Sequence, residues 1–363
     1  MKKVALITLY SNNNIGNKLQ NYAVQQFIKK LGDYEIVTIK NKPYLRLKDR
    51  LYILMKTDYK RIIKEKKRLK SFKKFDSFIK KTKYSVVTTN PKKINNNFDY
   101  YIVGSDQVWN PNFNYPINRI KKLYLLNFTN DTEKKISISA SFGVSELSEL
   151  VRKQVIDDLS KFKSLSVREL SGKKIIEELT KRKDVEVLLD PTMLIEDKEW
   201  DLVSKKPTKD VNEKFILNYF LGNLSQDKRN QINDFARKNG CQVINMLDKK
   251  DPFYTCGPSE FLWLEKNAFL ICTDSFHSSV FAILFKRPFV VFNRDDGQKG
   301  INSMNSRIEN LLTKFNLDNK YYIDRMNKHF LTCDYTHVDT ILKNEREKAK
   351  KYLLNALDDN TKK

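Results

Sequence analysis

The 363 residues are too many for one domain of ordinary size and suit two. With 40% hydrophobic and 12% aromatic residues, the composition supports two buried cores and excludes a disordered or fibrous chain. The formal net charge of +24 is large, so its distribution along the chain bears on the partners that the protein binds.

The N-terminal segment predicts a strand, a polar loop and a helix. Residues 4–9 form an apolar run suited to a buried parallel strand, and residues 18–31 carry apolar side chains at helical spacing. The apolar run is too short for the core of a signal peptide, and no run approaches the roughly 18 apolar residues of a membrane-spanning helix. The four cysteines include no Cys-x-x-Cys pair. We therefore expect a cytoplasmic protein with reduced thiols.

A strand at residues 35–39 completes a βαβ start, and a basic helical insertion follows at about 40–83. Residues 40–83 hold 18 Lys and Arg against 4 Asp and Glu, so they carry +14 of the net charge. One interpretation is a compositional bias on a solvated helical face, and the other is attraction to an anionic membrane surface or an acidic glycan. The segment has no nucleic-acid-binding motif, so no nucleic-acid partner is predicted. One apolar stripe along it comprises Ile62, Leu69, Phe72, Phe75 and Ile79.

Short apolar runs then alternate with helical segments in two series. The first series has strands at residues 100–103, 136–141, 165–168 and 185–189, with helices at about 147–161 and 171–182. After a polar stretch at 196–213, the second has strands at 215–221, 241–247, 268–272 and 288–292, with helices at 226–238, 258–266, 277–285 and 305–315. This alternation predicts an α/β fold of two Rossmann-like domains, residues 1–195 and 214–335, and a terminal amphipathic helix in 336–363. Two such domains with a cleft between them form a GT-B-type architecture.

Ligands of parallel sheets bind beyond the carboxyl ends of the strands, and three loops at such ends are unusually polar. The loop before the first helix contains Asn14, Gly16 and Asn17, whose N–H groups and amides suit hydroxyls or an anion. A capped helix start is the alternative there. The motif GSDQVWNP offers Asp106 and the neighbouring amide and indole as a sugar-binding rim. Its alternative is an Asx-type turn with a buried tryptophan.

The third polar loop, residues 273–279, opens a helix and contains His277 amid hydroxyl groups. The positive end of the helix favours neutral imidazole together with anion binding, and a purely structural histidine is the alternative. Arg168 ends a buried strand, and its guanidinium suits a phosphate or a carboxylate. An ion pair with Glu169 or another acid is the alternative. No carboxylate or His/Cys cluster has metal-ligand spacing, so no metal is expected.

Taken together, these motifs resemble the polysaccharide pyruvyl transferase family. The resemblance starts at the first strand and includes GSDQVWNP from Gly104, followed by SVRE and DPT. It continues through TDSFHSSVFAILFKRPFVVF from Thr273 to NSRIENLL from Asn305, and so covers most of residues 1–320. GSDQVW followed by DSFH is the specific part of the resemblance.

The resemblance implies a GT-B-like fold and transfer of a pyruvyl group from phosphoenolpyruvate onto two sugar hydroxyls, with release of phosphate and no further cofactor. That reaction protonates the methylene carbon of phosphoenolpyruvate, deprotonates the acceptor hydroxyl and needs cations for the phosphate. Arg168 matches a family arginine associated with the anionic groups of the donor. His277 matches a family histidine at the donor site and suits the acid or a phosphate ligand, while Asp106 suits the base.

Some members of the family have Arg-Leu before that histidine, whereas this sequence has Ser275-Phe276, which removes one expected cation. Lys286, Arg287, Arg294 and Arg307 are the candidates to replace it. The expected donor-binding residues are Arg168, Ser275, Ser278, Lys286 and Arg307. The expected acceptor-binding residues are Asn14, Gly16, Asn17, Gln107 and Trp109.

Two other functions stay open at this point. One is a GT-B glycosyltransferase, which would bind a nucleotide sugar in place of phosphoenolpyruvate. The other is a non-enzymatic basic module that binds a membrane or an acidic glycan through residues 40–83. For the pyruvyl transferase, the expected partners are phosphoenolpyruvate and a glycan or lipid-linked sugar acceptor. The basic segment would then dock the enzyme on the inner face of the membrane.

Overall fold

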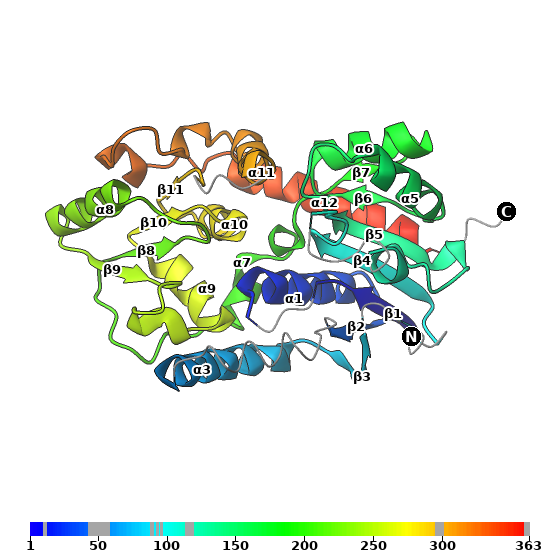
Figure 1. Cartoon of the computed structure of the whole chain (residues 1–363), viewed down its shortest axis with the longest axis horizontal. Helices are drawn as coiled ribbons and strands as arrows, with labels where there is room; N and C mark the ends of the chain where they lie inside the picture. The colour runs from blue at the N-terminus through cyan, green and yellow to red at the C-terminus, as the bar shows by residue number, and fades with distance from the viewer. Residues whose placement is uncertain are drawn as a thin grey trace. The chain divides into compact units, whose positions relative to one another are not determined.

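The structure is a computed structural model, and it describes residues 1–9, 13–42, 59–87, 91, 94, 97–112, 120–294 and 301–358. The chain divides into two compact units (Figure 1). Unit 1 comprises Met1–Thr57, Ser77–Ile195 and Lys343–Lys363. Unit 2 comprises Asp58–Asp76 and Glu196–Leu342. Each unit contains a parallel sheet with helices, as the alternation of apolar runs and helical segments predicts.

The sheet of unit 1 has the strand order β3-β2-β1-β4-β5-β6-β7, and neighbouring strands pair in parallel. The chain runs outward from β1 on one side and returns to place β4 on the other side, so the switch point lies between β1 and β4. The strands are β1 (Lys2–Ile7), β2 (Tyr34–Lys42), β3 (Lys81–Val87), β4 (Tyr100–Asp106), β5 (Lys135–Ala140), β6 (Ser166–Val167) and β7 (Glu186–Val187).

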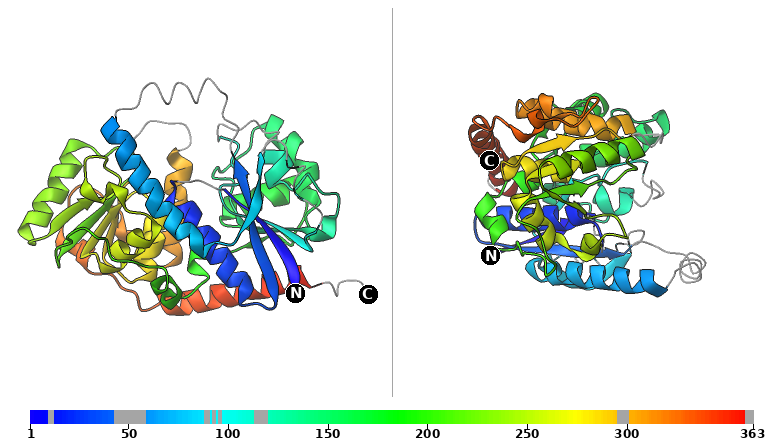
Figure 2. Two further views of the ribbon diagram at one scale, coloured as in Figure 1. Left: turned by 90° about the horizontal axis from the view of Figure 1, so that it is seen from below. Right: turned by 90° about the vertical axis from the view of Figure 1, so that its left-hand side faces the viewer.

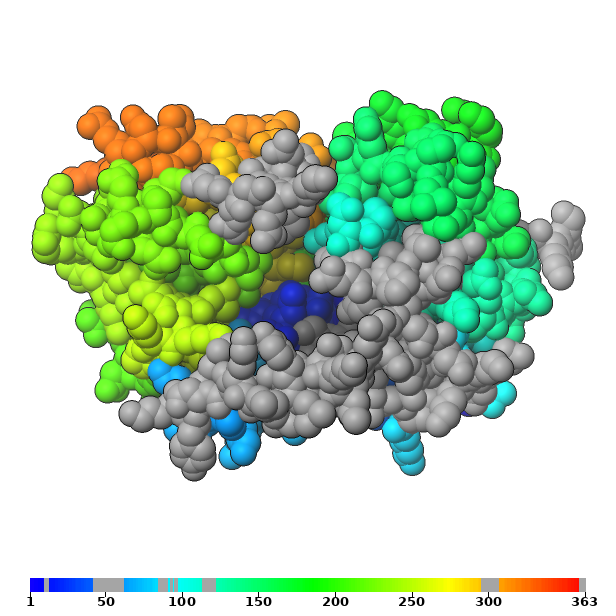
Figure 3. Space-filling model, in the orientation of Figure 1, coloured from blue at the N-terminus to red at the C-terminus, as the bar shows by residue number. Residues whose placement is uncertain are grey.

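Helices pack on this sheet through the apolar residues that the sequence places at helical spacing. Val155 of α5 and Ile175 of α6 belong to the same apolar cluster as Val103 of β4. The terminal helix α12 is held on unit 1 by Tyr352, whose hydroxyl donates to the Ser137 carbonyl at 2.7 Å. Figure 3 shows residues of α6, in green, on the outer surface of unit 1. The helical elements are α1 (Ile15–Lys29), η1 (Asp76–Phe78), η3 (Ile120–Tyr124), η4 (Thr132–Lys134), α5 (Glu149–Ser160), α6 (Leu170–Thr180), η5 (Pro191–Met193) and α12 (Val338–Leu357).

The sheet of unit 2 has the order β11-β10-β8-β9, again with parallel pairs, so its switch point lies between β8 and β10. Its strands are β8 (Phe215–Tyr219), β9 (Gln242–Asn245), β10 (Leu270–Thr273) and β11 (Phe289–Val291). Its helical elements are α3 (Tyr59–Phe75), α7 (Asp197–Asp201), α8 (Gln226–Lys238), η6 (Pro252–Thr255), α9 (Pro258–Asn267), α10 (Phe276–Leu284), α11 (Ile301–Lys314), η7 (Asp318–Lys320) and η8 (Lys328–Leu331).

Helix α3, the long blue helix in Figure 2, carries the apolar stripe of the basic segment except Ile79, which lies beyond it in unit 1. The helix packs within unit 2 against η6 and α9. Phe72 and Phe75 are buried, and the Arg68 guanidinium donates to the Tyr254 carbonyl at 2.6 Å. Gly257 permits this close approach, because a Cβ there would lie 2.8 Å from the Cβ of Ser71. Phe72, Phe75 and Ile79 of the stripe are therefore buried by protein, whereas Ile62 and Leu69 are half-buried.

The end of the basic segment differs from the helix expected through residue 82, because β3 begins at Lys81. Gln25 of α1 donates to the Lys80 carbonyl at 2.8 Å and accepts from the Lys80 N–H at 3.0 Å. This buried amide and the edge of β2 stabilise a strand that local periodicity does not reveal. Residues 43–58 of the segment lie outside the described residues. Among the described helices, none is both long and apolar enough to cross a membrane.

Candidate active site

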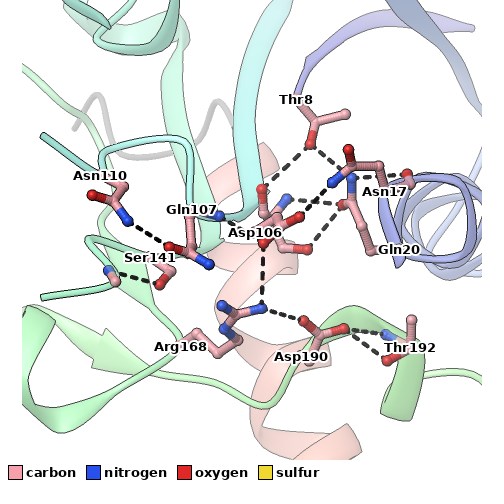
Figure 4. Close-up of polar contacts among 12 residues, drawn as sticks. Thr8, Asn17, Gln20, Asp106, Gln107, Asn110, Ser141, Arg168, Asp190 and Thr192 are labelled. Atoms are coloured by element: carbon pink, nitrogen blue, oxygen red, sulfur yellow. Dashed lines mark hydrogen bonds and ion pairs between the residues drawn. The ribbon is translucent and has the colours of Figure 1, made fainter. Parts of the chain in front are cut away.

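The loops that follow β1 and β4 come together at the switch point of unit 1, where ligands of open parallel sheets bind. Asn17, in the first turn of α1, donates from Nδ2 to Oδ2 of Asp106, the last residue of β4, over 2.5 Å. The backbone N–H of Gln107 donates to the other oxygen of that carboxylate at 2.8 Å. Figure 4 shows these groups converging from the two strand ends. The structure thus joins two of the three sequence-predicted loops at one carboxylate.

Buried polar side chains behind this carboxylate set its position. Gln20 is fully buried, and its Nε2 donates to Thr8 Oγ1 at 2.8 Å. Its Oε1 accepts from Ser105 Oγ at 2.9 Å. These bonds tie the ends of β1 and β4 to α1, so the helix that carries Asn17 is fixed relative to Asp106.

The motif GSD allows β4 to end in this geometry. Gly104 has a φ of +116°, and a Cβ there would lie 2.2 Å from the Ile138 carbonyl oxygen of the neighbouring strand. Only glycine fits at that position. Asp106 follows with a φ of 65°, a conformation that aspartate adopts more readily than most residues. The motif GSD therefore indicates both the carboxylate of Asp106 and the backbone turn that presents this carboxylate.

Arg168 is surrounded by carboxylates of its own unit. Its Nη1 donates to Asp190 Oδ2 at 2.8 Å and lies 3.9 Å from Asp106 Oδ1, while its Nε lies 3.7 Å from Glu169 Oε2. Its side chain is only 3% exposed. Burial lowers the pKa of Arg168, but the negative charges of Asp190, Asp106 and Glu169 outweigh it, and the pKa lies above its ordinary value. The guanidinium therefore stays charged.

These contacts match the alternative interpretation of Arg168, in which its guanidinium forms an ion pair with Glu169 or another acid. Three carboxylates face one guanidinium, so the cluster has an excess of negative charge, which disfavours a phosphate or carboxylate ligand there. Asp190 is itself held by Thr192, whose hydroxyl donates to Asp190 Oδ1 at 2.7 Å. In this conformation the guanidinium of Arg168 pairs with acids of its own unit, and its role toward a donor anion stays a prediction.

The tryptophan of GSDQVWNP lies in the core and does not form a rim. Trp109 is 3% exposed, its Nε1 donates to the Tyr124 carbonyl at 2.8 Å, and its ring packs against Phe142 and Phe162. The indole is therefore packed in the core that supports the loop, and neither face of its ring is accessible to a sugar. Gln107 is half-buried and directly follows Asp106 in the chain, and its Oε1 accepts from Asn110 Nδ2 at 2.5 Å.

The first polar loop combines a helix cap with a site contact. Asn14 is the N-cap of α1, and its Oδ1 accepts from the Asn17 N–H at 3.1 Å. Gly16 is buried in the first turn of the helix. The capping alternative therefore describes Asn14, whereas the side chain of Asn17 faces Asp106.

The switch point of unit 2 is built on a second aspartate. Asp274 follows β10 directly, is 4% exposed, and accepts from the N–H groups of Leu221 and Gly222, each at 2.7 Å. Arg294, beyond β11, donates from Nε to Asp274 Oδ2 at 3.0 Å and from Nη2 to the Asp274 carbonyl at 3.2 Å. The carboxylate joins the loops after β8 and β10 and holds one arginine beside them.

His277 lies in the first turn of α10, immediately beyond this cluster, and its ring is half-buried against Phe276. Ser275 is the N-cap of the same helix. Ser278 is fully buried, and its hydroxyl donates to Glu265 Oε1 at 2.6 Å. Ser278 therefore secures the helix in the core, and its role as a donor ligand stays a prediction.

The four candidates to replace the missing arginine before His277 have different surroundings in the structure. Lys286 pairs with the exposed Asp339 at 2.6 Å, and Arg287 donates twice to the Ala268 carbonyl. Arg307 is buried on α11. Arg294 hydrogen-bonds to the loop that leads into His277, so the fold places this cation at the strand end.

A family model of the polysaccharide pyruvyl transferases matches residues 14–296, which is more than half of the chain and includes Asn17, Asp106 and Asp274. The chain belongs to the polysaccharide pyruvyl transferase family. The family is one of transferases, and the motifs from GSDQVWNP to TDSFHSSVFAILFKRPFVVF lie inside the matched residues, whereas the first strand and NSRIENLL lie outside them. No curated protein matches the chain by sequence.

Solved structures share the fold of this pyruvyl transferase family member at low sequence identity. UDP-GlcNAc 2-epimerase from Methanocaldococcus jannaschii is 13% identical with a TM-score of 0.52, over 98% of this chain and 99% of that chain. A protein described as a UDP-N-acetylglucosamine 2-epimerase from Listeria monocytogenes is 10% identical with a TM-score of 0.51, over 97% and 90%. The likeness confirms the predicted GT-B-type α/β fold and concerns the fold alone.

Sequence reasoning did not select three acids that shape the two clusters of this family member. Asp274 stands in the DSFH motif and Asp190 in DPT, while Glu169 entered only as an alternative partner of Arg168. A charged residue directly after a buried strand is the signal that could have found them. Among the described residues, no group of three or more His, Cys, Asp or Glu side chains is arranged to hold a metal ion.

Proposed function

We propose that the protein transfers the pyruvyl group of phosphoenolpyruvate to two hydroxyls of a sugar in a surface or capsular polysaccharide precursor, as a cyclic ketal. The family match over residues 14–296 carries this proposal. The two strand-end clusters support it, because one is rich in carboxylates and amides and the other holds a cation beside a histidine.

The reaction balances without oxidation or reduction. A proton adds to the methylene carbon, which becomes a methyl group, and the first sugar hydroxyl adds to the central carbon and loses its proton. The bond from the central carbon to the phosphate oxygen then breaks, and inorganic phosphate leaves with the electron pair. The second hydroxyl adds to the same carbon, loses its proton and closes the ketal. Catalysis requires an acid, a base and cationic groups at the phosphate.

We assign the donor to unit 2 and the acceptor to unit 1. Arg294 is the cation for the phosphate or carboxylate of phosphoenolpyruvate, and His277 is the proton donor or phosphate ligand. The acceptor hydroxyls are assigned to Asn17 and Gln107, with Asp106 as the base. Arg168 acts on the acceptor through Asp106, which it positions.

Thermal shift and phosphate release test the donor assignment. A ligand that binds only the native state at about 100 times its Kd stabilises the protein by about 2.7 kcal/mol, which is a shift of several degrees. We expect phosphoenolpyruvate to produce this shift and to release inorganic phosphate only when a suitable glycan is added. Protection by UDP-GlcNAc with none by phosphoenolpyruvate would instead identify a nucleotide-sugar transferase.

We also propose that α3 docks the enzyme on an anionic membrane by electrostatics alone. Its lysines 66, 67, 70, 73 and 74 are exposed, whereas its apolar stripe packs within unit 2. Each lysine near an anionic surface contributes about 1 kcal/mol at most, and salt screens the attraction. We expect the protein to sediment with phosphatidylglycerol vesicles but not with phosphatidylcholine vesicles. High salt should abolish this sedimentation. No sedimentation at low salt would remove the membrane as a partner.

A further inference from the structure

A hollow of about 400 Å³ lies in unit 2 at the carboxyl ends of β8 and β9, on the side of β8 away from β10. It opens on the side of β8 away from the Asp274–Arg294 cluster, and the loop at Leu221 and Gly222 both lines it and donates to Asp274. Its lining combines amides, cations and apolar side chains, including Asn218, Asn245 and Arg229. A volume of this size accommodates a small ligand of one or two rings.

Asn218 and Asn245 face each other across the parallel pair β8–β9 at the same register position. Asn218 Nδ2 donates to Asn245 Oδ1 at 2.9 Å. Asn218 is only 6% exposed, and its Oδ1 is buried without a hydrogen-bond donor among the described residues. Buried acceptors are satisfied in most proteins, so a buried carbonyl oxygen without a donor at a hollow points to a ligand that donates.

The partner amide supplies the complementary group. The backbone N–H of Asn245 donates to Asp251 Oδ2 at 2.8 Å, which fixes the end of β9. Its side-chain oxygen is used by Asn218, and no described residue accepts from its Nδ2. The pair therefore offers one acceptor and one donor side by side. A sugar hydroxyl both donates and accepts, so a pair of adjacent hydroxyls matches this arrangement.

The rim of the hollow is cationic. Arg229, in α8, is exposed, and its Nε donates to the Leu224 carbonyl at 3.1 Å, which holds the guanidinium at the rim. Lys249 follows β9, with its Nζ 4.0 Å from Glu65. The one carboxylate in the lining, Asp248, accepts from the Lys250 N–H at 2.8 Å. The lining holds two cations and one acid, and because Lys249 also lies near Glu65, the exposed guanidinium of Arg229 is the group that favours a negatively charged substituent on the ligand.

We propose that this hollow binds an anionic sugar. Asn218 and Asn245 hydrogen-bond two of its hydroxyls, the apolar side chains, among them Phe220, contact the faces of its ring, and Arg229 and Lys249 bind its phosphate or carboxylate. The inference concerns binding and does not rest on the proposed reaction, because phosphoenolpyruvate has no hydroxyl pair and is assigned to the cluster around Arg294.

Saturation-transfer NMR on the whole protein tests the site with glucose 1-phosphate, glucuronate and glucose as probes. Transfer to the ring protons of one or both anionic sugars, stronger than to glucose, is expected, and the two probes distinguish a phosphate from a carboxylate. Asn218→Leu should weaken that binding about tenfold, the usual effect of losing a hydrogen bond in a binding site. If neither anionic sugar receives saturation from the protein at millimolar concentration, the proposal is overturned.

Rim variants keep the test independent of folding at the buried Asn218. Arg229→Ala should weaken the anionic sugars about tenfold and leave glucose unchanged. Arg237→Ala is the matched control on the same helix, because Arg237 is 79% exposed and pairs with Asp234. Equal effects of the two variants would contradict the site. Displacement of the sugar by phosphoenolpyruvate would also overturn it, because the hollow would then be the donor site.

Discussion

The two units place an aspartate and an arginine at their switch points, yet the two clusters differ in charge. In unit 1, Arg168 is 3% exposed and is surrounded by Asp106, Asp190 and Glu169. In unit 2, Arg294 is 15% exposed and, among the residues that the structure describes, contacts one carboxylate, Asp274. That carboxylate also accepts two backbone N–H groups.

This difference indicates what each switch point can bind. The guanidinium of unit 1 is neutralised by an excess of carboxylates, so that cluster suits hydroxyls and a base. The guanidinium of unit 2 shares its one carboxylate with backbone donors and lies beside the loop into His277, so that cluster suits an anion. We therefore propose that Arg168, which faces three acids, is structural and that Arg294, which faces one described acid, binds the donor.

His277→Gln tests the donor role of unit 2 and should have the largest effect. If the imidazole transfers a proton to the methylene carbon, kcat should fall by about 10²–10⁴, with a smaller change in KM for phosphoenolpyruvate. Steady-state phosphate release measures both constants. His329→Gln is the control, because His329 is exposed in η8. A normal kcat in the His277 variant would make this histidine structural.

Arg168→Met tests the structural role assigned to the arginine of unit 1. Removing the guanidinium leaves three carboxylates buried together, so the free energy of unfolding should fall by about 3–5 kcal/mol. Urea denaturation measures this change. The same substitution at Arg237, which is exposed, should change it by less than about 0.5 kcal/mol. A stable variant whose only defect is a raised KM for phosphoenolpyruvate would restore Arg168 as a donor ligand.

Arg294→Ala tests the ligand-binding role of the other arginine. Loss of a hydrogen bond to a charged ligand costs about 1.5–3 kcal/mol, so KM for phosphoenolpyruvate should rise about 10- to 100-fold. Lys286→Ala is the matched control, because Lys286 pairs with the exposed Asp339. Unchanged KM in the Arg294 variant, or an equal rise in the control, would mean that the comparison of the two arginines does not predict donor binding.

Glu265→Gln tests the core that supports His277 and should have the smallest effect. Burial raises the pKa of Glu265 well above its ordinary value, although the hydrogen bond from Ser278 lowers it. The folded protein therefore retains a proton that the unfolded chain releases above about pH 4.3, so Glu265 destabilises the fold increasingly as pH rises toward its folded pKa. We expect the glutamine variant to unfold like wild type at acid pH and to be more stable at neutral pH. Parallel stability curves from acid to neutral pH would contradict this.

Much of the fold and part of the site could be predicted because they depend on local pattern. Apolar runs and helical spacing report which residues are buried, and their alternation predicts parallel sheets. Parallel strands bring their carboxyl ends to one edge, so Asn17 and Asp106 could be placed near each other from sequence. Gly104 marks the backbone turn that presents Asp106 at the end of β4, because its φ of +116° excludes other residues.

Partners across the chain were decided by the tertiary structure. Periodicity shows that Trp109 and the stripe of α3 are apolar, but not that the indole lies in the core or that the stripe packs within unit 2. Arg168 meets Asp190 only because β6 and β7 are neighbours in the sheet. A guanidinium binds a protein carboxylate and a ligand phosphate through the same hydrogen bonds, so sequence alone could not tell Arg168 from Arg294.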